Sequence, residues 1–112
     1  MTASVFIDGE AGTTGLGIRE RLAHVKGIEI KSIDADKRKD PKARQALMAE
    51  VDAVVLCLPD DAAIEAVKLA DELGANAPRI LDVSTAHLVA HGWVYGFAEL
   101  HPTQRDMIEG AR

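Results

Sequence analysis

The stretch FIDGEAGTTGLG, residues 6–17, places four glycines directly after a short apolar run. That run, residues 4–7, predicts a buried strand that ends at the turn Asp8-Gly9. From residue 13 to about residue 25, apolar side chains recur close to the 3.6-residue period of a helix that buries one face. These side chains are Leu16, Ile18, Leu22 and Val25. The opening therefore predicts a strand, a tight loop and a helix, in that order.

Three further strands are expected along the chain. The strongest signal is the apolar run AVVLCL at residues 53–58, which Pro59 stops. An unbroken run of this length is typical of a strand buried on both faces of a parallel sheet. Weaker runs predict strands at residues 29–33 and 80–83, and residues 93–96 are expected to be extended.

Helices are predicted between these strands. Asp40 followed by Pro41 indicates an N-cap and a first helical position, which opens a helix through about residue 49. Asp60 and Asp61 are expected to supply cap and first-turn acids for a helix over residues 60–73. Its expected buried side is Ile64, Val67 and Ala70, with Gly74 just past its end, and a last helix is expected over about residues 102–110.

The alternation of strand and helix predicts the fold class. Each crossover helix must return the chain to the same edge, so we expect an α/β fold with a Rossmann-like doubly wound parallel sheet in three layers, α/β/α. A length of 112 residues with 47% hydrophobic residues suits one domain, residues 1–112.

The composition of the chain limits the kinds of partner that it can bind. The net charge is −5 and the one basic run is residues 37–39, which disfavours a nucleic-acid partner. The single cysteine, Cys57, cannot form an intramolecular disulfide, and no long apolar stretch predicts membrane insertion. We therefore expect a cytoplasmic protein with no membrane partner.

The glycine cluster matches a variant of the dinucleotide-binding fingerprint, with Gly9, Gly12 and Gly15 spaced G-x-x-G-x-x-G between the first strand and the first helix. Gly9 suits the sharp exit from the strand, Gly12 lacks a Cβ that would block a pyrophosphate, and Gly15 allows close packing of the helix. The amides and hydroxyls of Thr13 and Thr14 would face the phosphate. A glycine-rich turn without a ligand is the alternative. A P-loop is excluded because no Gly-Lys-Ser/Thr follows.

Two interpretations of the ribose side remain open. Asp34 and Asp36 follow the second strand and would suit the 2′-hydroxyl of NAD, whereas Lys37, Arg38 and Lys39 would suit the 2′-phosphate of NADP. Three adjacent cations in an acidic chain favour NADP(H). Arg38 is the first candidate because its planar guanidinium matches phosphate oxygens.

Five segments together resemble the shorter type of N-acetyl-gamma-glutamyl-phosphate reductase. They are FIDGEAGTTGLGIRERL, DADKRKD, AVVLCLPDDAA, LDVSTAH and WVYGFAEL, in this order and spacing. The first and fourth alone are shared in outline with aspartate-semialdehyde dehydrogenase, so a related domain of that kind is an alternative. The resemblance implies an oxidoreductase of arginine biosynthesis that reduces the acyl phosphate N-acetyl-glutamyl phosphate to the semialdehyde with NADPH and releases phosphate. It also implies a homo-oligomer at full length.

The resemblance assigns residues to the cofactor. It places Gly9, Gly12, Thr13, Thr14 and Gly15 on the phosphate loop, Lys37 and Arg38 at the 2′-phosphate, Leu58 and Pro59 beside the cofactor, and Ser84 on the loop that approaches the nicotinamide. Two positions depart from the pattern, with Leu88 where such proteins often carry Arg and Ala98 where they often carry Pro. The Arg would fix the loop or an anion.

The resemblance also implies a cysteine nucleophile, which forms a thioester before hydride arrives. That cysteine belongs to an Asn-Pro-Gly-Cys motif, which does not occur in these residues. Cys57 lies in the middle of AVVLCL, where burial raises a thiol pKa, so we interpret it as structural. The chain is therefore expected to be an N-terminal NAD(P)-binding domain that binds cofactor without turnover and carries no catalytic residue. A stand-alone nucleotide-sensing or interaction module is the alternative.

The remaining candidates have simpler structural explanations. His24 is expected near the end of a helix, and His91 and His101 in loops. His87 follows the fourth strand and would either line the site or lie in the loop. Trp93 and Tyr95 are expected to pack over the sheet edge. No spacing of His, Cys and acids predicts a metal site.

Overall fold

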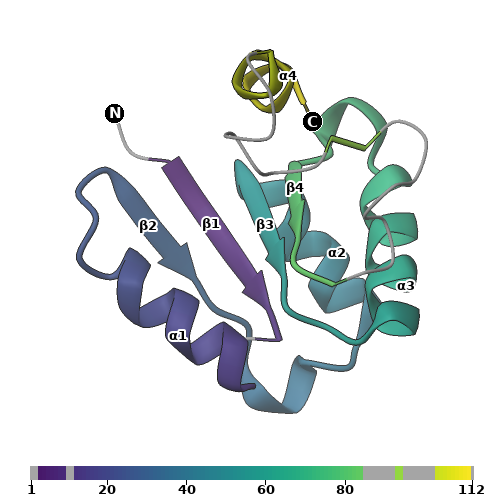
Figure 1. Cartoon of the computed structure of the whole chain (residues 1–112). Helices are drawn as coiled ribbons and strands as arrows, with labels where there is room; N and C mark the ends of the chain where they lie inside the picture. The colour runs from purple at the N-terminus through teal and green to yellow at the C-terminus, as the bar shows by residue number, and fades with distance from the viewer. Residues whose placement is uncertain (1–2, 10–11, 85–92, 95–102, 112) are drawn as a thin grey trace.

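Four parallel strands form a single sheet in the order β2-β1-β3-β4 in the computed structural model of the chain (Figure 1). The strands are β1 (Ala3–Asp8), β2 (Ile28–Lys31), β3 (Ala53–Leu56) and β4 (Arg79–Asp82). The structure describes residues 3–9, 12–84, 93–94 and 103–111. Strands that are parallel and out of sequence order require crossovers, so the predicted α/β fold with a doubly wound parallel sheet is confirmed.

Helices fill the connections as the sequence predicts. They are α1 (Thr13–Leu22), α2 (Pro41–Glu50), α3 (Asp60–Asp71) and α4 (Gln104–Gly110), with short 3-10 helices at Ala35–Lys37 and Gly74–Asn76. Asp40 caps α2 as predicted, its carboxylate accepting a 3.0 Å hydrogen bond from the Lys42 amide. The N-cap of α3 is Pro59, so Asp60 and Asp61 act as first-turn acids and the predicted capping role is wrong. Among the described residues, no helix is long and apolar enough to cross a bilayer.

Five predicted ends lie beyond the observed ones, and two of these belong to α3, which ends at Asp71, and β4, which ends at Asp82. β3 ends at Leu56 because its neighbour β1 turns away after Asp8, although the Cys57 amide still donates to the Asp8 carbonyl at 2.9 Å. α1 ends at Leu22 because the next amides form tighter turns, and the Val25 amide donates to the Leu22 carbonyl at 3.0 Å. β2 ends at Lys31, after which the chain enters the 3-10 helix.

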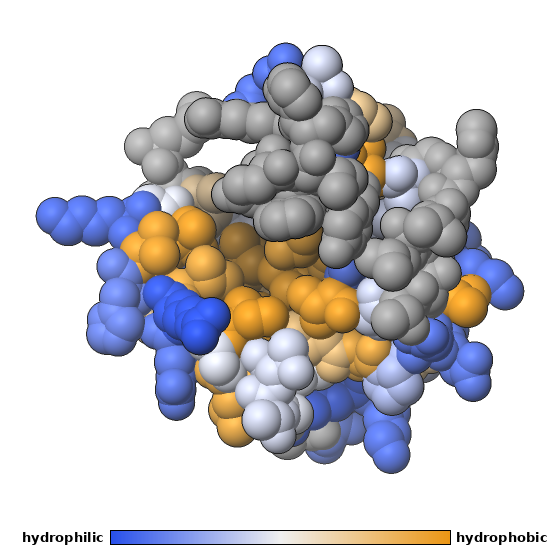
Figure 2. All heavy atoms as spheres, viewed as in Figure 1, coloured by the Kyte–Doolittle hydropathy of each residue, from blue (hydrophilic) through white to orange (hydrophobic). Residues whose placement is uncertain are grey.

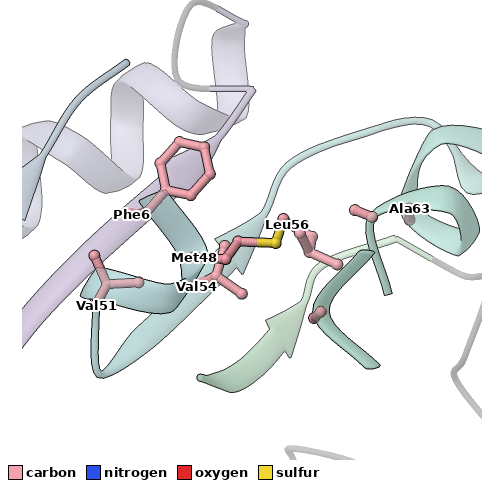
Figure 3. Packing of buried hydrophobic residues seen from close by; sticks show 8 residues of the cluster. Phe6, Met48, Val51, Val54, Leu56 and Ala63 are labelled. Atoms are coloured by element: carbon pink, nitrogen blue, oxygen red, sulfur yellow. The ribbon is translucent and has the colours of Figure 1, made fainter. Parts of the chain in front are cut away.

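The helices cover both faces of the sheet. α2 and α3 pack on one face and α1 on the other, where Ile18 and Leu22 meet the β1 and β3 side chains (Figure 1). The larger core lies under α2 and α3 and comprises Phe6, Met48, Val51, Val54, Leu56, Ala63, Ala66 and Ala70. Within it, the Met48 side chain extends beside Val54 toward Leu56 (Figure 3). The result is the predicted three-layer arrangement.

The buried faces of two helices differ from the predicted ones. α3 buries Ala63, Ala66 and Ala70, whereas Ile64 is 40% exposed. The buried side of α3 is formed by small alanines, with Val67 partly buried against the core and Ile64 outside it. In α1, Ile18 and Leu22 are packed while Leu16 is 49% exposed, and Val25 beyond the helix is also exposed. Ala70, Ile18 and Leu22 are packed as predicted, so apolar periodicity predicted the buried faces of these helices in part.

The same substitution at two neighbouring strand positions tests this core. Leu56 of β3 is 0% exposed and Leu81 of β4 is 58% exposed. Leu56→Ala should lower the free energy of unfolding by about 2–5 kcal/mol, because it removes buried contacts and leaves a cavity. Leu81→Ala should cost less than about 1 kcal/mol. Urea unfolding of both variants measures the difference, and equal losses would contradict this account of the core.

Candidate functional site

The carboxyl ends of β1 and β3 meet at the point where the sheet reverses its strand order. β1 lies between β2 and β3, and the chain leaves β1 toward α1 on one face and β3 toward α3 on the other. Ligands of open α/β sheets bind at such a switch point, outside the carboxyl ends of the strands. The glycine cluster follows β1, and Leu58 and Pro59 follow β3. The fold therefore brings these two predicted groups together.

Gly9 adopts the left-handed backbone that the sharp exit from β1 requires, with φ +89°. A Cβ at this position would lie 2.4 Å from the Cys57 carbonyl oxygen and 3.2 Å from Cδ2 of Leu58. Both constraints exclude a side chain. The start of the loop is thus packed against the residues that leave β3.

The fold does not require a glycine at position 12 as it does at position 9. It is the N-cap of α1, with extended backbone angles that any residue adopts, and a Cβ there would only touch the Gly9 carbonyl at 3.5 Å. Its amide donates to the Gly9 carbonyl at 3.1 Å, and its carbonyl accepts from the Leu16 amide at 2.9 Å. Gly15 is buried within α1. A need for glycine at position 12 would therefore come from a ligand.

The N-terminus of α1 carries no acid of its own. α2 has the Asp40 cap and α3 has Asp60 and Asp61 in its first turn, whereas the first turn of α1 contains the exposed Thr13 and Thr14 and no acidic residue. Amides in the first turn of a helix have no partner within the helix and lie at the positive end of its dipole. This end is suited to an anion from outside the helix.

The predicted cations lie beyond β2, the strand that flanks β1 on the side away from β3. Lys37 ends the 3-10 helix and its amide donates to the Asp34 carbonyl at 2.9 Å. Lys37, Arg38 and Lys39 are all exposed. At the same end of β2, Nη1 of Arg19 donates to the Ser32 hydroxyl at 2.7 Å and links α1 to β2. Sequence reasoning did not single out this contact.

Ser84 lies beyond β4, separated from the glycine cluster by β3. Its amide donates to the Asp82 carboxylate at 2.8 Å, which turns the chain at the end of the strand. His87, Leu88, His91, Tyr95, Ala98 and His101 lie outside the described residues. His24 is exposed just beyond α1. In the part of the chain that is described, no cluster of His, Cys, Asp and Glu could hold a metal ion.

A buried ion pair at this end of the sheet is absent from the sequence predictions. Nη2 and Nε of Arg44 in α2 donate to Oδ2 of Asp8 at 2.6 and 3.1 Å, and these residues are 8% and 6% exposed. Burial raises the pKa of Asp8, while the hydrogen bonds and charge of Arg44 oppose this rise. Helical spacing could have placed Arg44 on the buried face of α2, because Arg44 precedes the core residue Met48 by one turn.

Cys57 lies beside this pair and is half-buried against the cluster that includes Val55. Burial raises the pKa of its thiol, and the negative charge of Asp8 raises it further. The predicted rise in pKa is confirmed. A thiol held protonated in this way is a poor nucleophile, in keeping with a structural role.

Gly9 and Gly17 allow a matched test of the loop geometry. Gly9→Ala should destabilise the fold by about 1–3 kcal/mol from the left-handed backbone alone, with the contact to the Cys57 carbonyl adding to this loss. Gly17→Ala should stabilise it by about 0.5–1 kcal/mol, because Gly17 is helical and a Cβ there meets nothing within 4 Å. Thermal unfolding reports both, and a stable Gly9→Ala variant would contradict this geometry.

Comparison with known proteins gives close relatives along the whole chain. No protein-family model matches it. It is 54% identical over 108 residues to N-acetyl-gamma-glutamyl-phosphate reductase 2 of Nostoc sp., and 55% identical over 108 residues to the reductase of Trichormus variabilis. These matches cover 96% of this chain and 33% of each relative. With the reductase of Chelativorans sp. it shares 48% identity over 112 residues, which is 100% of this chain and 35% of that protein.

The chain thus spans about a third of the length of the curated relatives that it matches. Reductases are oxidoreductases, and a parallel doubly wound sheet is a fold that commonly holds a nucleotide cofactor. The resemblance stated from the five sequence segments is confirmed at high identity. By sequence, the chain is a homologue of N-acetyl-gamma-glutamyl-phosphate reductases over about a third of their length.

Proposed function

We propose that this chain is the NADP(H)-binding domain, residues 1–112, of an N-acetyl-gamma-glutamyl-phosphate reductase of arginine biosynthesis. The observation that carries the proposal is the glycine loop, which opens α1 at the switch point of the sheet in a chain 48–55% identical to such reductases. The full-length protein would be a cytoplasmic homo-oligomer that acts on a small acyl-phosphate substrate, with no nucleic-acid or membrane partner.

The residues at the carboxyl edge fit the pyrophosphate of such a cofactor. Gly9 and Gly12 would let the backbone approach the phosphates, and Gly15 would keep α1 close to the sheet. The amides of Thr13 and Thr14 would donate to phosphate oxygens at the positive end of α1. Two observations support this assignment. The first turn of α1 contains no acid. The fold has room for a Cβ at position 12, so the fold itself does not require a glycine there.

The other residues would hold the two ends of the cofactor. Lys37 and Arg38, both exposed beyond β2, would bind the 2′-phosphate, and Arg38 would offer two parallel donors. Leu58 and Pro59 beyond β3 would lie against the cofactor, and Ser84 beyond β4 would approach the nicotinamide.

When bound, NADPH supplies a hydride to the carbonyl carbon of an activated acyl group. This chain would bind and orient the cofactor. Its one thiol is a poor nucleophile, because burial and, to a smaller extent, Asp8 raise its pKa. By the resemblance, the nucleophile that would accept the acyl group would belong to the part of such reductases that this chain does not match. We therefore expect these 112 residues to bind NADPH without turning over substrate.

Cofactor choice is tested by titration of the chain with NADPH and NADH. NADPH should bind at least about tenfold more tightly, because a charge-assisted contact to the 2′-phosphate is worth about 1.5–3 kcal/mol. Arg38→Gln should lower the affinity for NADPH by a similar factor and leave the affinity for NADH unchanged. Equal affinities for the two cofactors in the unmodified chain would refute the assignment of Lys37 and Arg38.

The phosphate loop is tested with one substitution at two glycines. Gly12→Val should abolish binding of both cofactors by filling the space of the pyrophosphate, while the fold remains, since a Cβ at Gly12 meets only an ordinary contact. Gly17→Val in the same helix is the control and should bind as the unmodified chain does. Calorimetric titration and far-UV circular dichroism separate binding from folding. Retained binding by Gly12→Val would show that the loop is not the phosphate site.

A further inference from the structure

The buried pair of Arg44 and Asp8 has no part in the binding proposed above. Arg44 lies on the core side of α2, one turn before Met48, which is 0% exposed. Both its contacts go to one oxygen of Asp8, Nη2 at 2.6 Å and Nε at 3.1 Å, across 36 residues of sequence. The guanidinium is 9% exposed, so it is not presented to a ligand as Lys37 and Arg38 are.

A buried ion pair is weak evidence of a contribution to stability. Removing two charges from water is costly, and apolar side chains of similar volume often stabilise a core at least as well. Burial outweighs Arg44 in its effect on the Asp8 carboxylate, whose pKa is raised despite that partner. Whatever it adds to stability, a buried pair of this kind imposes a geometry on the two elements that it joins.

That geometry concerns the entrance to the glycine loop. Asp8 is the last residue of β1 and is bonded covalently to Gly9. Its carbonyl accepts from the Cys57 amide at 2.9 Å while its carboxylate is held by Arg44. The Gly9 carbonyl then accepts from the Gly12 amide at 3.1 Å. Contacts thus run continuously from α2, through the end of β1, to the N-cap of α1.

We propose that Arg44 is a positioning residue for the phosphate loop: by gripping one oxygen of Asp8 from two nitrogens, it fixes the exit of the chain from β1 and aims the first-turn amides of α1. Arg44 touches no cofactor atom in this role. The proposal rests on the proposed function, since it concerns how the same loop meets a pyrophosphate. Two donors from a planar group fix an orientation that a single ammonium cannot.

The test compares two probes on the 112-residue chain. NADPH contains the pyrophosphate, whereas adenosine 2′-monophosphate carries only the adenosine and the 2′-phosphate. Arg44→Met should lower the affinity for NADPH at least about tenfold, because the loop is no longer preorganised. The affinity for adenosine 2′-monophosphate should change by less than about twofold. Arg44→Lys should recover only part of the NADPH affinity. Equal weakening of both probes, or no weakening, overturns the positioning role.

Two further variants separate positioning from stability. Asp8→Asn combined with Arg44→Met leaves no lone buried charge, so this double variant should be more stable than Arg44→Met alone yet still bind NADPH weakly. Val51→Ala destabilises the core at the C-terminal end of α2, seven residues after Arg44, and should keep the ratio of the two affinities unchanged. A double variant that binds NADPH normally would refute the proposal, even if Arg44→Met alone fails to fold.

The outcomes also distinguish this proposal from the proposed function. If the unmodified chain binds neither probe, the cofactor assignment fails and the positioning role falls with it. If the unmodified chain binds both and Arg44→Met keeps the ratio of affinities, the cofactor assignment stands and only the role of Arg44 is refuted.

Discussion

The contact between the carboxyl ends of β1 and β3 is the constraint on which the rest of the site depends. The Cys57 amide donates to the Asp8 carbonyl, and one residue later Gly9 passes so close to the Cys57 carbonyl that a Cβ would lie 2.4 Å from it. Backbone packed this tightly leaves the chain one direction in which to turn. This contact therefore constrains the path of the chain into α1, together with the hold of Arg44 on the Asp8 carboxylate.

The two faces of the sheet are covered differently. α3 approaches through Ala63, Ala66 and Ala70, which are small enough to bring the helix close to Val54 and Leu56. On the face that bears α1, an apolar surface remains visible beside that helix (Figure 2). The crossovers on opposite faces leave the carboxyl edge of β1 and β3 between them, and this places the glycine loop at the switch point.

The charged side chains buried at this edge of the sheet are paired with each other. Asp8 and Arg44 form an ion pair inside the protein, and burial, with a smaller contribution from the Asp8 charge, raises the pKa of the Cys57 thiol. The first turn of α1 contains no acid, whereas α2 has an Asp40 N-cap and α3 has Asp60 and Asp61 in its first turn. An anion arriving at this edge would meet helix amides and no carboxylate from that turn.

Local sequence determined the order of strands and helices, the Asp40 cap and the left-handed turn at Gly9, because these depend on residues a few positions apart. The resemblance drawn from the sequence segments agrees with relatives that are 48–55% identical along the chain. Only the tertiary structure decided where β3 ends, because a strand stops when its partner turns away. The same holds for the pairing of Asp8 with Arg44, which is set by the face of α2 that meets β1 and joins residues that sequence spacing does not relate.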